Sequence, residues 1–193
     1  MHNHSFQSLT SLGNDELDRV LEAGVPPAFS SIAGSEFRGW NVFGDFMGRA
    51  VGTVLGIQRF AKGFFARDAG GDVDGLEAIE GYNVKIQRGT KDEPWTAIPD
   101  DARPTRFGFY KVWKAGLGDG RLGRHPNALL LDYSQGNPKP GLFEGGGLKD
   151  FVVQVSADNP NLLLGKAYMM LGPVSTPPSF FVIERLRKVD FRP

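Results

Sequence analysis

Five apolar stretches of strand length follow one another in the second half of the chain: FGFYKVW (Phe107–Trp113), NALLLDYS (Asn127–Ser134), FVVQVS (Phe151–Ser156), LLLGKAYMML (Leu162–Leu171) and FFVIERL (Phe180–Leu186). Apolar runs separated by Gly, Pro, Asn and Asp are typical of strands in an antiparallel meander. Upstream, Glu36–Val42, Arg59–Arg67 and Gly81–Arg88 have the same character and bring the count to about eight. Eight antiparallel strands suffice to close a small barrel with room for side chains or one small ligand. The sequence therefore predicts a mainly β protein that closes into a barrel.

One domain over residues 1–193 is the simplest organisation, because barrels of this length are routinely single units and no repeat or linker interrupts the chain. A helix is predicted over residues 14–24. Asn14 is its predicted N-cap, acidic residues fill its first turn, and Gly24 ends it before two prolines. We expect this helix to cap one end of the sheet and residues 1–13 to be flexible.

Four glycines recur at a strict spacing of four residues between Gly44 and Gly56. If this segment is a second short helix, the glycines share one face. That face either lets the helix approach the sheet closely or forms the interface of a homodimer. Charged residues at both ends leave too short an apolar stretch for a membrane span.

Composition excludes several classes of function. Twenty-two basic and 22 acidic residues cancel, so a nucleic-acid partner is not expected. The chain has no Cys and 3 His, two of them near the N-terminus, so neither a metal site nor a cofactor is predicted. The start of the chain lacks the pattern of a signal peptide, and no apolar run is long enough to span a membrane. These features predict a soluble cytoplasmic protein.

Three motif matches do not predict a functional site. Asp68–Asp74 is an acidic loop without the spacing of an EF-hand, so a solvated turn is the better interpretation. Gly118–Gly123 matches the dinucleotide pattern G-x-G-x-x-G, but a strand follows where a helix is needed. His125, the only internal imidazole, precedes Pro126 at a loop edge and makes a poor member of a catalytic triad.

The strands suggest a better site. With the two-residue period of a strand, three sets of side chains share a face and hold one ionisable residue among apolar ones. The sets are Phe107, Phe109, Lys111 and Trp113; Leu162, Leu164, Lys166, Tyr168 and Met170; and Phe180, Val182, Glu184 and Leu186. If these faces point inward, Lys111, Lys166 and Glu184 converge in an apolar cavity, where each must pair with another or with a ligand. Structural ion pairs, or a register that places these charges outside, remain as alternatives.

The segment Glu36–Trp40 follows the predicted helix and opens the eight-strand pattern. In this it resembles the calycin superfamily of lipocalins and fatty-acid-binding proteins. Lipocalins carry a G-x-W element on the first strand, whose Trp packs across the bottom of the barrel beneath an Arg from near the last strand. Here Gly39 and Trp40 are adjacent, and the resemblance implies Arg185 or Arg187 in the covering role.

We therefore expect non-catalytic binding or carriage of a hydrophobic or amphipathic small molecule inside the barrel. The predicted ligand-binding residues are Phe107, Phe109, Lys111, Trp113, Lys166, Tyr168, Met170 and Glu184. One alternative is a barrel-type isomerase, cyclase or hydrolase acting on a lipid-like substrate. Its acid or base would be Glu184 or Asp132, and its partner Tyr133 or Tyr168. A second alternative is a structural protein that self-associates through the glycine face.

Overall fold

A computed structural model describes residues 4–43, 58–67, 71–114, 125–138, 147–171, 174–175 and 178–193. In these ranges the strands are β1 (Ser35–Val42), β2 (Arg59–Phe65), β3 (Ala78–Val84), β4 (Arg106–Trp113), β5 (Leu129–Asp132), β6 (Leu148–Gln154), β7 (Leu162–Leu171), β8 (Val174–Ser175) and β9 (Ser179–Lys188). The helices are α1 (Phe6–Leu9), α2 (Asn14–Ala23), α3 (Phe29–Ile32) and the 3-10 turn η2 (Tyr133–Gln135). The glycine-spaced segment 44–56 and the motif at 118–123 lie outside the described residues.

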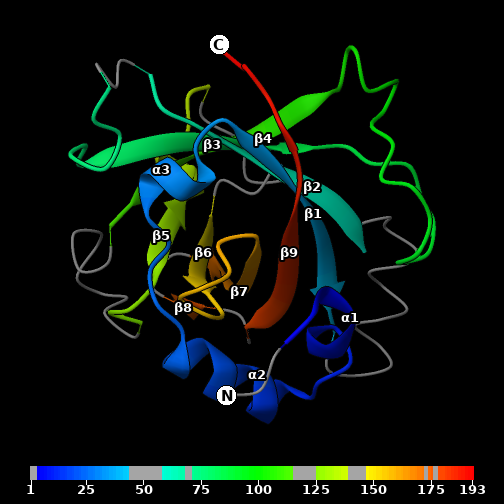
Figure 1. The fold of residues 1–193 in the computed structure, drawn as a ribbon, viewed down its shortest axis with the longest axis vertical. Helices are drawn as coiled ribbons and strands as arrows, with labels where there is room; N and C mark the ends of the chain where they lie inside the picture. Colours follow the sequence, from blue (N-terminus) through cyan, green and yellow to red (C-terminus); the bar gives the residue numbers. More distant parts are fainter. Residues whose placement is uncertain are drawn as a thin grey trace.

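Eight of these strands form a closed barrel (Figure 1). The hydrogen-bonded order is β6-β5-β4-β3-β2-β1-β9-β7, and β7 pairs with β6 to complete the ring. Every pairing is antiparallel, and β8 adds only to β7. Closure leaves no free edge on the ring strands, which removes a common route to aggregation. The predicted mainly β barrel of about eight strands is confirmed.

The lumen of the barrel contains one of two apolar clusters. Lys62 on β2 contacts Asp150 on β6, and these strands lie opposite each other in the ring, so their contact crosses the interior. Side chains with the same alternation therefore face the lumen. They are Phe37, Phe64, Ile79, Tyr110, Val112, Leu129, Leu131, Tyr133, Val152, Leu163, Phe181 and Ile183, joined by Phe29 and Ile32 of α3. Helix α3 thus fills the end of the lumen at which β1 begins.

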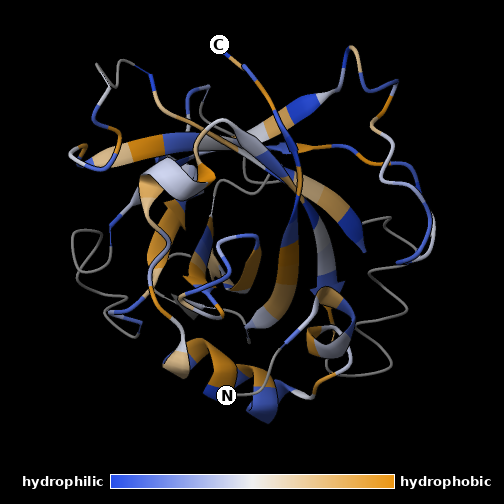
Figure 2. Ribbon diagram, in the orientation of Figure 1, coloured by the Kyte–Doolittle hydropathy of each residue, from blue (hydrophilic) through white to orange (hydrophobic). Residues whose placement is uncertain are grey.

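The outer face of the barrel is apolar too. Its cluster includes Ala61, Tyr82, Leu130, Phe151, Val153, Leu164, Tyr168 and Val182, and it is covered by Phe6, Leu9, Leu17, Leu21 and Trp95 from the N-terminal helices and the 85–105 connection. Figure 2 shows the result as nearly continuous apolar colouring along β5, β7 and the first half of β9. Strands buried on both faces carry such continuous runs, whereas half-exposed strands alternate.

The N-terminal helix forms where the sequence predicts it. Helix α2 begins at Asn14, and its N-cap is Gly13, whose N–H donates to Glu16 Oε2 at 3.1 Å, so the prediction that Asn14 is the cap is wrong. Leu17 and Leu21 are fully buried against the outer cluster. Helix α1 lies within the segment expected to be flexible, and its Phe6 and Leu9 are fully buried. In the described ranges, no helix has the length and apolar character needed to cross a membrane.

Candidate ligand-binding site in the barrel lumen

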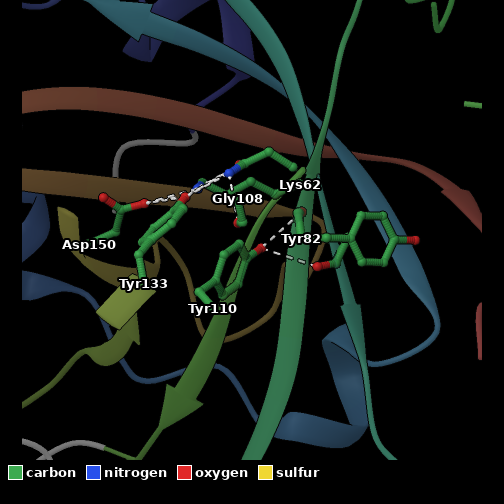
Figure 3. Close-up of polar contacts among 8 residues, drawn as sticks. Lys62, Tyr82, Gly108, Tyr110, Tyr133 and Asp150 are labelled. Carbon is green, nitrogen blue, oxygen red and sulfur yellow. Dashed lines mark hydrogen bonds and ion pairs between the residues drawn. The ribbon is translucent and has the colours of Figure 1, made fainter. Parts of the chain in front are cut away.

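A buried ion pair lies in the lumen. Alternation along β2 points Phe60, Lys62 and Phe64 to the same side, and Lys62 Nζ lies 2.9 Å from Asp150 Oδ2 on β6. The side chains of Lys62 and Asp150 are 4% and 2% exposed. Figure 3 shows the two groups facing each other, with the ring of Tyr82 pointing away to the other side of the sheet. Two opposite strands therefore each contribute one charge to a buried site inside the barrel.

Neutral polar groups complete the coordination of the Lys62 ammonium. Lys62 Nζ donates to Asn83 Oδ1 at 3.1 Å and to the hydroxyl of Tyr133. That hydroxyl also accepts from Asn83 Nδ2 at 3.0 Å and lies 3.4 Å from Asp150 Oδ2, to which it donates. The three ammonium hydrogens thus have three acceptors, as a buried charge requires.

A β-bulge shapes the wall beside Asn83. The register shifts between Gly81 and Asn83 on β3, where β4 contains an extra residue. Gly108 takes a φ of 52° there, a left-handed conformation that glycine adopts without steric cost, and its carbonyl accepts from Asn83 Nδ2 at 3.2 Å. The bulge also turns Phe107 to the luminal side, where it pairs with Asn83 and lines the cavity.

Aromatic rings surround the amine of Lys62. The ring centroids of Phe60, Tyr110, Tyr133 and Phe181 lie 5.5, 5.0, 5.1 and 5.2 Å from Nζ. Such contacts stabilise a cation, most strongly where it is desolvated. A glycine on the adjacent strand makes room for a ring: a Cβ at Gly165 would lie 2.0 Å from Phe181 Cζ. Gly165 therefore makes room for a large ring inside a narrow barrel.

Burial shifts the protonation equilibria of the ion pair. Desolvation lowers the pKa of Lys62 and raises the pKa of Asp150, and the attraction between the two groups only partly opposes both shifts. Burial also raises the pKa of the Tyr133 and Tyr110 hydroxyls, so both are neutral. Both shifts of the pair favour the form in which the proton has moved from the amine to the carboxylate. One buried carboxylate oxygen, Asp150 Oδ1, has no hydrogen-bond partner among the described residues.

A cavity of about 600 Å³ leads to this pair from the end of the barrel opposite α3. Its lining includes luminal residues from strand ends around the ring, among them Phe60, Asn83, Phe107, Tyr133, Leu148, Ala167, Met169, Ser179 and Phe181, and also Lys62 and Asp150. Two further cations line it, Lys85 and Arg88, which we call the basic rim. Arg59 also lines it, but its guanidinium donates to the carbonyls of Glu93 and Pro94 and lies 4.1 Å from the ring centroid of Trp95. A cavity with apolar walls and a few convergent polar groups is typical of a small-molecule site.

The structure places most of the predicted site residues elsewhere. Phe107 lines the cavity, whereas Phe109, Trp113, Tyr168 and Met170 belong to the outer cluster. The three predicted ionisable residues do not meet one another. Lys166 pairs with Asp18 of α2, Glu184 pairs with Arg38, and Lys111 Nζ lies 4.2 Å from the ring centroid of Trp113. The register therefore places these charges outside, which is the alternative the sequence left open.

The residues named in the other sequence hypotheses are also placed. Asp132 pairs with Lys149 at 2.6 Å and does not reach the cavity lining, while its neighbour Tyr133 does. Arg185 lies over Phe37, 4.8 Å from the ring centroid, and Arg187 pairs with Glu36, so neither is seen in contact with Trp40. At the closed end of the barrel, Arg185 thus covers Phe37.

Lys62 and Asp150 were missed by sequence reasoning, although a signal for them was present. Phe60, Lys62 and Phe64 form an apolar set with one central charge, and Leu148, Asp150 and Val152 form another. The rule that selected the later strands also selects these two. This rule does not favour Lys62 and Asp150 over the other candidates, because strand faces on the outside of the barrel have the same pattern.

The chain was compared with known proteins, and no family model and no curated protein matches it. Among the described residues, no cluster of three or more His, Asp or Glu side chains could hold a metal ion.

Proposed function

We propose that the barrel binds an amphipathic small molecule in its lumen. The observation that carries this proposal is the cavity of about 600 Å³ that has aromatic walls and reaches a buried ion pair. Protein interiors are close-packed, and a polar group buried without a partner is unfavourable. A ligand that fills the lumen and forms a hydrogen bond with Asp150 Oδ1 satisfies both conditions.

The charges around the cavity favour one orientation of the ligand. Among the described residues, Lys62, Lys85 and Arg88 line it together with one carboxylate, Asp150. The ammonium hydrogens of Lys62 already have acceptors, and Asp150 would repel an acidic group placed beside it. An acidic head group therefore belongs at the basic rim, and the apolar body belongs between the aromatic rings. The favoured ligand is an amphiphile with one acidic group.

Fluorescence titration with 8-anilinonaphthalene-1-sulfonate, an apolar anion, tests the proposal. Ala167 lines the lumen, so Ala167→Phe fills the cavity, while Ala157 is exposed between β6 and β7 and Ala157→Phe is the matched control. We expect the luminal substitution to weaken dye binding about tenfold or more and the control to leave it unchanged. Equal titration of both variants would place the dye elsewhere and remove support for luminal binding.

The predicted self-association depends on residues 44–56, outside the described part of the chain, and stays a prediction.

A further inference from the structure

We propose that Lys62 forms a reversible imine with an aldehyde or ketone group at the inner end of the ligand. The inference rests on the proposed luminal binding and names the reactive group of the ligand class. It assigns a covalent chemistry to the ion pair, which a purely structural pair would not have.

The position of Lys62 distinguishes it from the other buried lysines. Within the described ranges three lysines are buried, Lys62, Lys149 and Lys166. Lys149 pairs with Asp132, and Lys166 pairs with Asp18 on the outer face. Lys62 alone of the three lines the luminal cavity, so its amine is the one that a bound carbonyl group can approach.

The neighbours of Lys62 can move the protons that imine formation needs. Asp150 Oδ2 lies 2.9 Å from Nζ, within reach of direct proton transfer. Transfer along this contact gives a neutral, nucleophilic amine and a carboxylic acid. The lowered pKa of Lys62 and the raised pKa of Asp150 favour this form. The hydroxyl of Tyr133 touches both groups and holds them in place.

The chemical steps balance without any further reactant. The neutral amine attacks the carbonyl carbon, a C–N bond forms, and the carbonyl oxygen takes the proton of the Asp150 carboxyl. Asp150 then removes one proton from the nitrogen and returns it to the hydroxyl, which leaves as water as the C=N bond forms. The net reaction converts the Lys62 ammonium and a carbonyl compound into an iminium ion and water. Asp150 ends as the carboxylate beside the iminium charge, which the aromatic rings also stabilise.

Reductive trapping tests the proposal. The protein is incubated with trans-cinnamaldehyde and sodium cyanoborohydride, and the adduct is located by peptide mass spectrometry. We expect one adduct per chain on Lys62, formed about tenfold or more faster than on exposed lysines outside the cavity such as Lys188, because binding holds the aldehyde beside the amine. Lys62→Met should abolish this adduct, and Lys149→Met, which removes a buried lysine that does not line the cavity, should retain it. Locating the adduct in the wild-type protein tests the proposal even if a variant does not fold.

Displacement of the anionic dye by trans-cinnamaldehyde and by cinnamyl alcohol separates the two proposals. Displacement by both compounds without an adduct on Lys62 would overturn the imine and leave luminal binding intact. Failure of both to displace the dye would count against luminal binding itself. An adduct spread evenly over the lysines, as in urea-unfolded protein, would also overturn the imine.

Discussion

Two lysines, one on each side of the same barrel wall, show how differently one sequence pattern can be used. Lys62 and Lys166 each interrupt an apolar set on a strand, and each is buried and paired with an aspartate. The partner of Lys62 is 2% exposed in its side chain, whereas Asp18, the partner of Lys166, is 39% exposed. Both partners of the inner pair are buried, whereas the outer pair has one partner that is partly exposed to water.

Access to solvent determines how much stability is lost when one partner of an ion pair is removed. Removing two charges from water costs several kcal/mol per ion, which their attraction offsets only in good geometry with further hydrogen bonds. The inner pair meets this condition through Asn83 and Tyr133. The outer pair is partly hydrated, so losing one partner leaves the other in contact with water. The inner pair should therefore be far more sensitive to removal of one partner.

The largest effect is expected when the inner pair is broken. Asp150→Leu leaves the Lys62 charge buried without its counter-ion and should lower the free energy of unfolding by about 3 to 5 kcal/mol. Urea denaturation measures the loss. The double variant Lys62→Met/Asp150→Leu removes both charges and should recover most of it. Comparable losses in the single and double variants would mean that packing, and not charge, governs this site.

The second effect separates the two faces by function. Gly165 makes room for Phe181 in the lumen, where a Cβ at position 165 would lie 2.0 Å from the ring. Gly63 makes room for Tyr82 on the outer face, where a Cβ at position 63 would lie 2.2 Å from the ring. Each Gly→Ala substitution should destabilise the protein by about 1 to 3 kcal/mol through overpacking. Because Phe181 lines the cavity and Tyr82 does not, only Gly165→Ala should also weaken dye binding. Equal effects on dye binding would contradict the assignment of the lumen.

The strands and their closure could be predicted from sequence because apolar runs and turn residues are local signals. Strand β7 has the predicted bounds Leu162–Leu171, and β4 begins one residue before the predicted Phe107. Which face of each strand points into the lumen could not be predicted. Helices α1 and α2 and the connection around Trp95 cover the outer face, so both faces carry the pattern of a core.

Strict alternation fails at one further point. It places Phe107 and Phe109 on the same face, but the bulge at Gly108 separates them, and Phe109 packs against Tyr82 and Phe191 outside. A lone glycine in a strand is consistent with a bulge, yet sequence alone does not distinguish it from Gly165, which has no bulge. The kind of site, an apolar strand face with one charge, could therefore be predicted from the sequence. The residues that form it could not.

The third prediction uses pH to isolate the inner carboxylate. In Lys62→Met, Asp150 loses the cation that opposes the upward shift of its pKa. Between 3.8, the ordinary pKa of the group, and its raised folded value, the native state binds more protons than the unfolded state, so stability falls as pH rises. The deficit of the variant relative to the wild type should therefore grow by about 1 to 2 kcal/mol between roughly pH 3 and pH 7. Urea denaturation at both pH values measures it, and a constant deficit would show that Asp150 does not ionise differently in the two proteins.

The smallest effect is expected from the outer pair, and it completes the comparison. Asp18→Asn keeps the size of the side chain and its ability to accept a hydrogen bond from Lys166, whose side chain is 9% exposed. The ammonium also lies 5.0 Å from the ring centroid of Phe180, which continues to stabilise it. The loss in the free energy of unfolding should be no more than about 1 kcal/mol and should shrink at high salt. A loss as large as that of Asp150→Leu would mean that solvent does not reach the outer pair. Burial of the lysine alone would then determine how much stability is lost when its aspartate is changed, on either face of the barrel.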